Sequence, residues 1–295
     1  MRTLAVGTRV SVEVPATSAN LGPGFDCFGL ALDWRERVDL EVAASGISVD
    51  VTGEGSEALP RDETHLVVRC LTEGLDDLGV RVPGLAVRGH NTIPHGRGLG
   101  SSSAAIVAGL LGARALAGAG DDPAWLLRHA NRIEGHPDNV AAAIHGGFVM
   151  AYAHGDHVAV AQGRVHPDVR AAVVVPDRPV ETRAARRLLP DAVPHADAAA
   201  DAGRAALLVH ALAHEPHLLA VATQDWLHQR YREPAMPEAY ALMSRLRAAG
   251  FAAVVSGAGP SVLVLGTDAE LNRLEAAEPG TRFRRSGIGG AARAL

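Results

Sequence analysis

A glycine- and serine-rich stretch limits what this chain can fold into more than any other segment: residues 93–111 read IPHGRGLGSSSAAIVAGLL. The alternating glycines Gly96, Gly98 and Gly100 permit positive φ angles and let a ligand approach the main chain closely. The run that follows is apolar nearly all round, which predicts a buried helix over residues 101–117. A loop that opens onto a helix N-terminus directs several N–H groups and the helix dipole at one point, so the stretch predicts a phosphate site.

The chain contains no lysine: all 28 of its basic residues are arginines. This excludes the Walker A loop and the protein-kinase site, both of which use a lysine on phosphate. A dinucleotide-binding fingerprint is also a poor match, since the spacing here is GxGxG followed by serines. An anion in this loop is therefore held by main-chain amides and serine hydroxyls, and a hydroxyl also offers an oxygen to Mg²⁺.

The bulk composition is that of an ordinary globular protein. A length of 295 residues is comfortable for two domains, and 47% of the residues are hydrophobic. A formal net charge of −5 provides no general basic field, so we expect no nucleic-acid partner. Cys27 and Cys70 lack CxxC spacing and indicate reduced thiols. We find neither a signal peptide nor a long uncharged apolar run, and therefore expect a cytoplasmic protein with no membrane partner.

Hydrophobic periodicity divides the chain into interleaved strands and helices. Period-two alternation predicts strands at residues 8–17, 37–44, 47–53, 83–94 and 169–177, a hairpin over 146–163 and a strand–loop–strand over 251–266. Helical spacing predicts helices at residues 62–79, 180–189, 196–213 and 237–249. Asp122, Pro123 and Gly135 predict the cap, first position and end of a further helix. This mixture indicates an α+β fold.

Four segments resemble motifs of the GHMP kinase superfamily and occur in that superfamily's order. PHGRGLGSSSAA, residues 94–105, is similar to its phosphate loop. VPATSANLGPGFD, residues 14–26, is similar to its first motif, and SGAGPSVLVL, residues 256–265, to its third. The form of the first motif and the segment IEGHPDNVAAAIHGGF, residues 133–148, are similar to the homoserine kinase branch.

The resemblance implies both a fold and a reaction. The implied fold has two domains: residues 1–160, an ATP-binding domain like ribosomal protein S5 domain 2, and residues 161–295, a ferredoxin-like domain. The implied reaction is ATP-dependent phosphorylation of the L-homoserine hydroxyl to O-phospho-L-homoserine, a step in threonine biosynthesis. ATP and L-homoserine are then the substrates, with Mg²⁺ as cofactor. Homodimers are common in the family, so a second copy of the chain is a candidate partner.

The resemblance also implies which residues hold the nucleotide. Glu134, at the end of a predicted helix, is the implied Mg²⁺ ligand, and Ser102 is favoured over Ser101 as the second oxygen ligand. One carboxylate together with phosphate oxygens and waters is the usual way to hold Mg²⁺. The implied ATP-binding residues are Pro94, Arg97, Gly98, Leu99, Gly100, Ser101, Ser102, Ser103, Gly257 and Gly259.

L-Homoserine is a small zwitterion, and its site needs a fork for the carboxylate and an acceptor for the ammonium. Arg186, flanked by Thr182 and Pro190 at the family's spacing, and Arg232, in LHQRYRE, are the implied forks. By the same resemblance Asp26 accepts from the ammonium, while Asn20, Asn139 and Thr182 complete the substrate site. The expected catalytic set is Glu134, Ser102, Asn139 and Arg186. Arg230 stands where the family has proline, which leaves the placement of Arg232 open.

Several alternatives stay open at this point. Asp26 and Asp138 are the only nearby carboxylates that we identify as candidate bases, and substrate-assisted transfer is an equal option. Another superfamily acceptor, such as mevalonate, a sugar or a diphosphocytidyl-erythritol, would not explain two converging arginines if it is neutral. A non-catalytic ligand sensor would be free to lose Glu134 and the loop glycines. We interpret His95, His136 and His145 as structural or surface residues, because they lack metal-ligand spacing.

Overall fold

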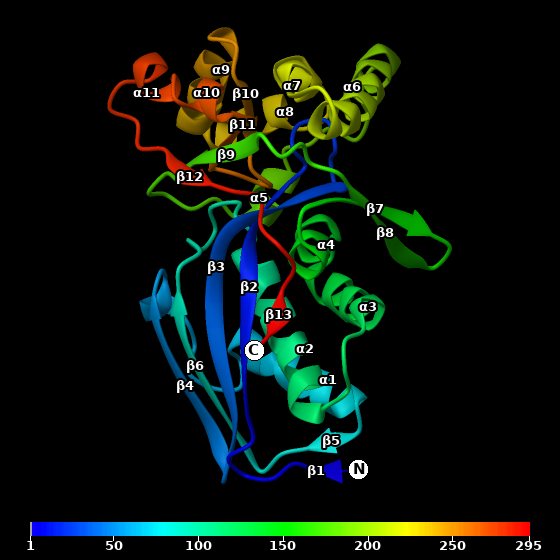
Figure 1. Cartoon of the computed structure of the whole chain (residues 1–295), viewed down its shortest axis with the longest axis vertical. Coiled ribbons are helices and arrows are strands. Elements are labelled where there is room, and N and C mark those ends of the chain that lie inside the picture. Colours follow the sequence, from blue (N-terminus) through cyan, green and yellow to red (C-terminus); the bar gives the residue numbers. More distant parts are fainter. Residues whose placement is uncertain (1) are drawn as a thin grey trace.

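The computed structural model describes residues 2–295 and places two β-sheets toward opposite ends of the long axis of the molecule (Figure 1). The larger sheet has the order β13-β2-β3-β6-β4, and β7 and β8 extend it from β3. Its strands are β2 (Arg9–Ala19), β3 (Phe28–Ala43), β4 (Gly46–Gly53), β6 (Gly84–Asn91), β7 (Phe148–His154), β8 (His157–Gly163) and β13 (Arg293–Ala294). Neighbouring strands run antiparallel except β4 and β6. A short parallel pair joins β1 (Arg2–Thr3) to β5 (Val80–Arg81).

One face of the larger sheet is covered by helices (Figure 1). These are α1 (Leu66–Asp77), α2 (Ser101–Ala117), α3 (Pro123–Glu134) and α4 (Asp138–His145). Helix α2 contacts α1, α3, α4 and β2, which explains why its sequence is apolar nearly all round. Helix α3 begins as predicted, since the Asp122 side chain accepts a hydrogen bond from the Trp125 amide. It ends at Gly135, whose φ of 87° suits glycine.

The smaller sheet is antiparallel, with the order β10-β11-β9-β12. Its strands are β9 (Val169–Val174), β10 (Ala252–Val255), β11 (Val262–Thr267) and β12 (Arg284–Ser286). The helices of this half are α5 (Thr182–Arg186), α6 (His195–Ala213), α7 (Leu219–Ala222), α8 (Gln229–Arg232), α9 (Pro237–Ala248), α10 (Asp268–Leu271) and α11 (Leu274–Ala277). Single 3-10 turns lie at Ser56–Ala58, Pro216–Leu218 and Glu233–Ala235. The sequence-based expectation of an α+β fold is confirmed.

Three features differ from the sequence predictions. The strand predicted at residues 37–44 is only the second half of β3, a strand of 16 residues. The helix predicted at 180–189 is wrong in length, because α5 ends at Arg186 and the chain turns before Pro190. The division expected after residue 160 falls inside β8, and the chain returns to the larger sheet at β13. Within residues 2–295, no helix is both long and apolar enough to cross a membrane.

Candidate active site

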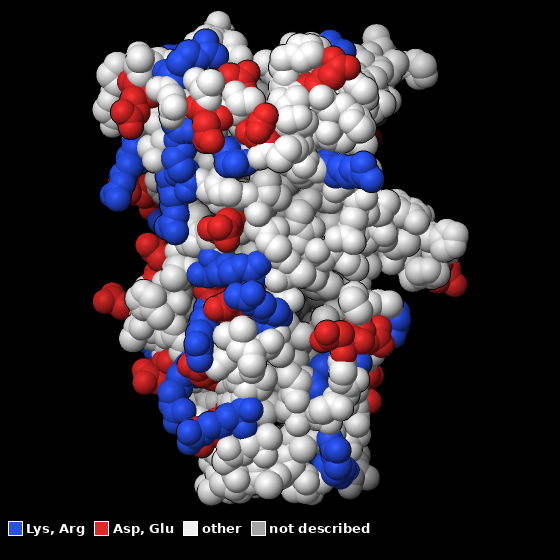
Figure 2. Space-filling view, in the orientation of Figure 1, with Lys and Arg blue, Asp and Glu red and all other residues white. Residues whose placement is uncertain are grey.

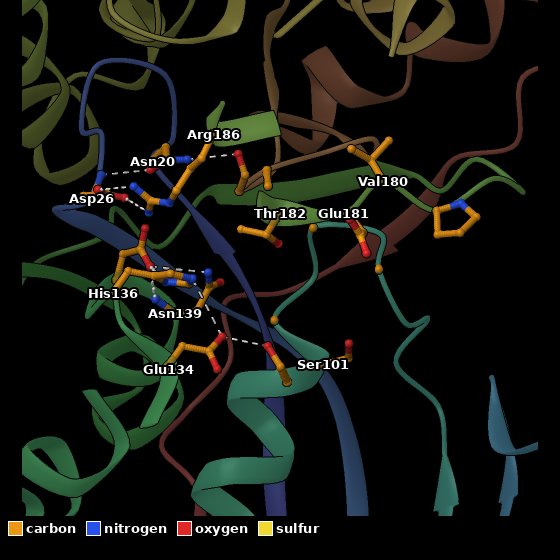
Figure 3. A pocket seen from close by; sticks show the side chains of 18 of the residues that line it. Asn20, Asp26, Ser101, Glu134, His136, Asn139, Val180, Glu181, Thr182 and Arg186 are labelled. Atoms are coloured by element: carbon orange, nitrogen blue, oxygen red, sulfur yellow. Dashed lines mark hydrogen bonds and ion pairs between the residues drawn. The ribbon is translucent and has the colours of Figure 1, made fainter. Parts of the chain in front are cut away.

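A cavity of about 390 Å³ is lined by residues from both halves of the chain (Figure 3). It brings together most of the residues predicted from the sequence motifs. These are Asn20, Asp26, Gly98, Gly100, Ser101, Ser102, Glu134, Asn139, Thr182, Arg186, Arg232 and Gly257. One end of the cavity therefore carries the glycine loop and Glu134, and the other carries Asp26 and the arginines.

The predicted nucleotide contacts Pro94 and Arg97 lie behind the loop rather than on this cavity. The guanidinium of Arg97 donates to the carbonyls of His95, at 2.6 Å, and Pro176, at 3.1 Å, and also to that of Asp177. Its charged end is thus used to tie the loop to the segment that follows β9. Sequence position alone could not predict this, because the carbonyl of Pro176 lies 79 residues away along the chain.

Three further predicted residues also lie outside the lining. The side chain of Leu99 is in the core, only 1% exposed, and its carbonyl accepts from the Thr17 amide at 3.0 Å. Ser103 is fully buried in the first turn of α2. Gly259 packs so closely on Met236 that a Cβ there would lie 2.4 Å from the Met236 sulfur. Leu99 and Gly259 support the loops through packing and main-chain contacts, while the Ser103 hydroxyl donates to Glu134.

Hydrogen bonds to main-chain carbonyls join the three glycine-rich motifs into one floor. The Ser256 hydroxyl donates to the Gly98 carbonyl at 2.6 Å, and the Gly257 amide donates to the Ala19 carbonyl at 3.1 Å. Gly98 and Gly100 both have positive φ, 71° and 69°. A Cβ on Gly100 would lie 2.0 Å from the Thr17 hydroxyl oxygen, so glycine is required there by packing as well as by backbone conformation.

Helix α2 begins directly after Gly100 and points its N-terminus into the cavity (Figure 3). The first amides of a helix have no intrahelical partner, and here the first helical bond runs from the Ala104 amide to the Gly100 carbonyl. No acidic side chain lies in the first turn to neutralise the helix dipole. The loop thus presents free N–H groups and a partial positive charge to an anion.

Glu134 lies beside the first turn of α2, where it contacts two serines, and its carboxylate is labelled in Figure 3. Its Oε1 accepts from the Ser102 hydroxyl at 2.7 Å and from the Ser103 hydroxyl at 2.9 Å. Ser102 is exposed to the cavity while Ser103 is buried, so Ser102 is the hydroxyl with access to a ligand. A carboxylate beside a hydroxyl is an all-oxygen donor set, and the residues present therefore fit Mg²⁺.

The opposite end of the cavity holds an ion pair. Arg186, on α5, donates to both carboxylate oxygens of Asp26, at 2.8 and 2.5 Å (Figure 3). Both side chains are 35% exposed, and the hydrogen bond to Asp26 raises the pKa of Arg186. Asn20 positions Asp26 by accepting from its amide at 3.0 Å and anchors the turn by donating to the Gly257 carbonyl at 2.9 Å. Both polar atoms of Asn20 thus have protein partners.

Arg232 is 2% exposed and places a second guanidinium on the cavity. It donates to the Gly257 carbonyl at 3.0 Å, while its Nε has no partner among residues 2–295. Burial, together with the charge of Arg186, lowers the pKa of Arg232 to about 10, so the group stays cationic at neutral pH. The centroid of the Phe25 ring lies 5.4 Å from the guanidinium carbon of Arg186 and 5.3 Å from that of Arg232. Arg230 faces outward and bonds Asp197 at 2.5 Å.

His136 corrects an expectation, because it lines the cavity and is not simply a structural or surface residue. Its Nδ1 lies 3.0 Å from Asp138 Oδ1, and its Nε2 lies 3.9 Å from Glu134. Burial lowers the pKa of His136, but the hydrogen bond and charge of Asp138 outweigh it and the net shift is upward. Asn139 is held by the Thr17 hydroxyl, 2.8 Å from its Oδ1. The sequence feature that could have placed His136 at the site is its position two residues after Glu134, the predicted Mg²⁺ ligand.

A smaller apolar cavity of about 160 Å³ adjoins the loop and shares Ser101 and Ser102 with the first. Its other lining residues include Leu59, Leu66, Val67 and Val87, with Glu36 and His65 among the polar ones. Glu36 Oε2 and His65 Nδ1 have no partner among residues 2–295. Burial raises the pKa of Glu36 to about 7 against the opposing effect of hydrogen bonds from the Ile93 and Thr92 amides. None of the sequence motifs predicts this cavity.

Comparison with known proteins agrees with this geometry. Residues 65–147 match the GHMP kinases N terminal domain and residues 201–277 match the GHMP kinases C terminal domain. Homoserine kinase from Streptomyces avermitilis is 54% identical over 268 residues, which cover 90% of this chain and 88% of that protein. The chain belongs to the homoserine kinase family. The resemblance to the homoserine kinase branch of the GHMP kinases, found in the sequence motifs, is confirmed.

Other homoserine kinases agree in sequence and in fold. The protein from Streptomyces coelicolor is 54% identical over 90% of this chain and 87% of its own length. The crystal structure of homoserine kinase from Cytophaga hutchinsonii superimposes with a TM-score of 0.84 at 27% identity, covering 99% of this chain and 98% of that one. The expected two-domain GHMP kinase fold is confirmed, and membership of a kinase family makes ATP the expected co-substrate.

Proposed function

We propose that the chain transfers the γ-phosphoryl group of ATP to the side-chain hydroxyl of L-homoserine, with Mg²⁺ as cofactor. One observation carries the proposal: a single cavity holds an anion-binding loop with a carboxylate at one end and two guanidiniums with a carboxylate at the other. The first end suits a triphosphate and the second suits a small zwitterion. The homoserine kinases at 54% identity support the same substrate.

At the nucleotide end, the amides of residues 98–103 bind the phosphates and fix them against the N-terminus of α2. Glu134 and Ser102 are the residues that would hold Mg²⁺, which neutralises phosphate charge and orients the γ-phosphoryl group when bound. The cavity beside Ser101 and Ser102 suits the purine base, because its lining is mostly apolar and it directly adjoins the loop. Phosphoryl transfer asks mainly for this alignment and charge stabilisation.

At the acceptor end, Arg186 and Arg232 bind the carboxylate of the amino acid and Asp26 binds its ammonium group. Asp26 and Arg186 already pair with each other at 2.8 Å. When the amino acid binds, this internal pair is replaced by two pairs, one between Asp26 and the ammonium group and one between Arg186 and the carboxylate. Thr182 and Asn139 lie between the two ends and orient the hydroxyl toward the phosphoryl group. A neutral sugar would leave both guanidiniums without a partner.

Both aspartates named as candidate bases, Asp26 and Asp138, already have partners. In this arrangement Asp26 binds the ammonium group, and Asp138 accepts from the Asn139 amide at 2.7 Å and lies 3.0 Å from His136. His136 directs Nδ1 at Asp138, 3.0 Å away, and its Nε2 lies 3.9 Å from Glu134, so both ring nitrogens face carboxylates. We therefore favour substrate-assisted transfer, in which the proton passes to a phosphoryl oxygen.

The test is a panel of acceptors assayed by ADP release, with the product identified by mass spectrometry. L-Homoserine, mevalonate and galactose are compared at equal concentrations with Mg²⁺ and ATP. The proposal predicts ADP release with homoserine in excess of the other two and a product of the mass of O-phospho-L-homoserine. Absence of homoserine-dependent ADP release would refute it.

A further inference from the structure

A second large cavity, of about 630 Å³, lies behind the glycine loop and has no part in the reaction proposed above. Pro94 and Arg97 line it from the loop, Trp34 from β3, and Arg282 and Arg284 from β12 and the residues just before it. Figure 2 shows basic side chains over the region in which Figure 1 places β12. The walls of this second cavity thus come from both sheets and from the glycine loop between them.

Trp34 is the first observation that points to a ligand. The residue is 5% exposed, and its indole Nε1 is buried with no hydrogen-bond partner among residues 2–295. An indole N–H is only a donor, so its missing partner is an acceptor. Buried donors without a partner are rare and costly, and the residue that carries this one lines the cavity.

The charges on the wall point to the same kind of ligand. The Arg284 guanidinium carbon lies 3.4 Å from the Trp34 ring centroid, and burial with the charge of Arg282 lowers the pKa of Arg284. Within residues 2–295 the side chains of Arg282 and Arg284 make no hydrogen bond or ion pair. Arg97 bonds only carbonyls through its guanidinium. The guanidinium groups that line the cavity therefore have few hydrogen-bond acceptors among the described residues.

Two carboxylates, of Glu54 and Asp177, also line the cavity and set a limit on the ligand. Three guanidiniums against two carboxylates leave a single excess positive charge, which suits a small anion better than a polyanion. We propose that this cavity is a second ligand site, for a phosphate or carboxylate group of a small molecule. The Trp34 indole N–H and the guanidiniums of Arg282 and Arg284 are its donors, because guanidinium groups pair with such oxyanions.

The test is isothermal titration calorimetry of the full chain with inorganic phosphate and, separately, with malonate. Saturating Mg²⁺ and a non-hydrolysable ATP analogue are present, so that the catalytic loop is filled. Arg284→Gln removes a charged donor, and Trp34→Phe removes the N–H while keeping a ring for Arg284. The matched control is Arg285→Gln, on the same strand, because Arg285 does not line the cavity and bonds Asn272 at 3.1 Å.

We expect saturable binding of at least one anion, weakened about tenfold by Arg284→Gln and by Trp34→Phe and unchanged by Arg285→Gln. The anion that binds identifies phosphate or carboxylate as the recognised group. No saturable heat with either anion, or equal affinity in all four proteins, overturns the proposal. Arg284→Gln and Trp34→Phe change this cavity and no residue of the proposed active site, so their result is separable from that of the acceptor panel.

Discussion

The guanidinium of Arg186 and the carboxylate of Asp26 form a two-bond ion pair at the acceptor end of the cavity, with N–O distances of 2.8 and 2.5 Å. The two residues are 160 positions apart in the sequence and come from different halves of the chain. Their pairing means that the chain carries, before any substrate binds, the two charges that a zwitterion requires. A substrate that supplies both opposite charges can replace the pair without leaving either residue unpaired.

Arg186→Gln should therefore impair the use of homoserine specifically. We expect KM for homoserine to rise about 30-fold or more, because a bidentate charged contact is lost, while KM for ATP stays within about twofold. Initial-rate kinetics with each substrate varied separately would measure this. Arg230→Gln is the matched control, since it breaks the Arg230–Asp197 pair outside the cavity and should change neither constant. Equal effects of Arg186→Gln on both substrates would contradict the assignment.

Glu134→Gln should separate catalysis from nucleotide binding. We expect turnover to fall by about two orders of magnitude or more, because the charge that would hold Mg²⁺ at the phosphates is removed. ATP should still bind, through the amides of the loop, and calorimetry with an ATP analogue would measure that. Glu275→Gln, on α11, supplies a neutral control on the surface. Near-normal turnover of Glu134→Gln would remove this residue from the mechanism.

The two glycines that bound α2 provide a matched test of the loop geometry. Gly100 and Gly118 both have positive φ, but a Cβ on Gly100 meets the Thr17 hydroxyl at 2.0 Å while one on Gly118 meets nothing within 4 Å. Gly118→Ala should cost about 1 kcal/mol from backbone strain alone. Gly100→Ala should cost about 2 kcal/mol more, because it adds a packing clash. Urea unfolding of both variants measures the difference, and equal losses would show that the close approach at Gly100 is not tight.

Glu36 should make stability depend on pH. Its folded-state pKa is raised by burial from 4.5 to about 7, so the folded protein holds a proton that the unfolded chain releases. The free energy of unfolding therefore decreases as pH rises from about 4.5 to about 7 and this contribution levels off above that. Glu36→Gln removes the titration, and its stability relative to the wild type should improve by about 2–3 kcal/mol between pH 4.5 and pH 8.

Urea unfolding of wild type and Glu36→Gln at pH 4.5, 6, 7 and 8 measures this difference. Glu57→Gln, at an exposed position, is the control and should show no such trend. A difference between wild type and Glu36→Gln that stays constant with pH would show that Glu36 ionises freely in the folded protein.

Sequence patterns predicted the elements whose signals are local. The glycine spacing and the apolar run gave α2 and its loop, and Asp122, Pro123 and Gly135 gave both ends of α3. Helix α4 was not predicted, because Pro137 and the preceding glycine read as loop signals. Strand β13 was missed because two residues carry no period; it forms only through pairing with β2.

The site was predictable as a set of residues but not as a set of contacts. The motifs identified Asn20, yet its bond to the Gly257 carbonyl joins residues 237 positions apart. The direction of Arg97, away from the cavity, depends on the Pro176 carbonyl. The sequence left the position of Arg232 open, because Arg230 stands where the family has proline. In the structure α8 turns Arg230 outward and Arg232 inward. Such contacts depend on how distant segments pack, which no local pattern contains.

A crystal structure with Mg²⁺, a non-hydrolysable ATP analogue and L-homoserine tests the central claim most directly. We expect the phosphates on the main-chain amides of residues 98–103, the metal between Ser102 and Glu134, and the homoserine carboxylate at Arg186 and Arg232. A triphosphate bound away from the glycine loop, or homoserine bound outside this cavity, would contradict the account.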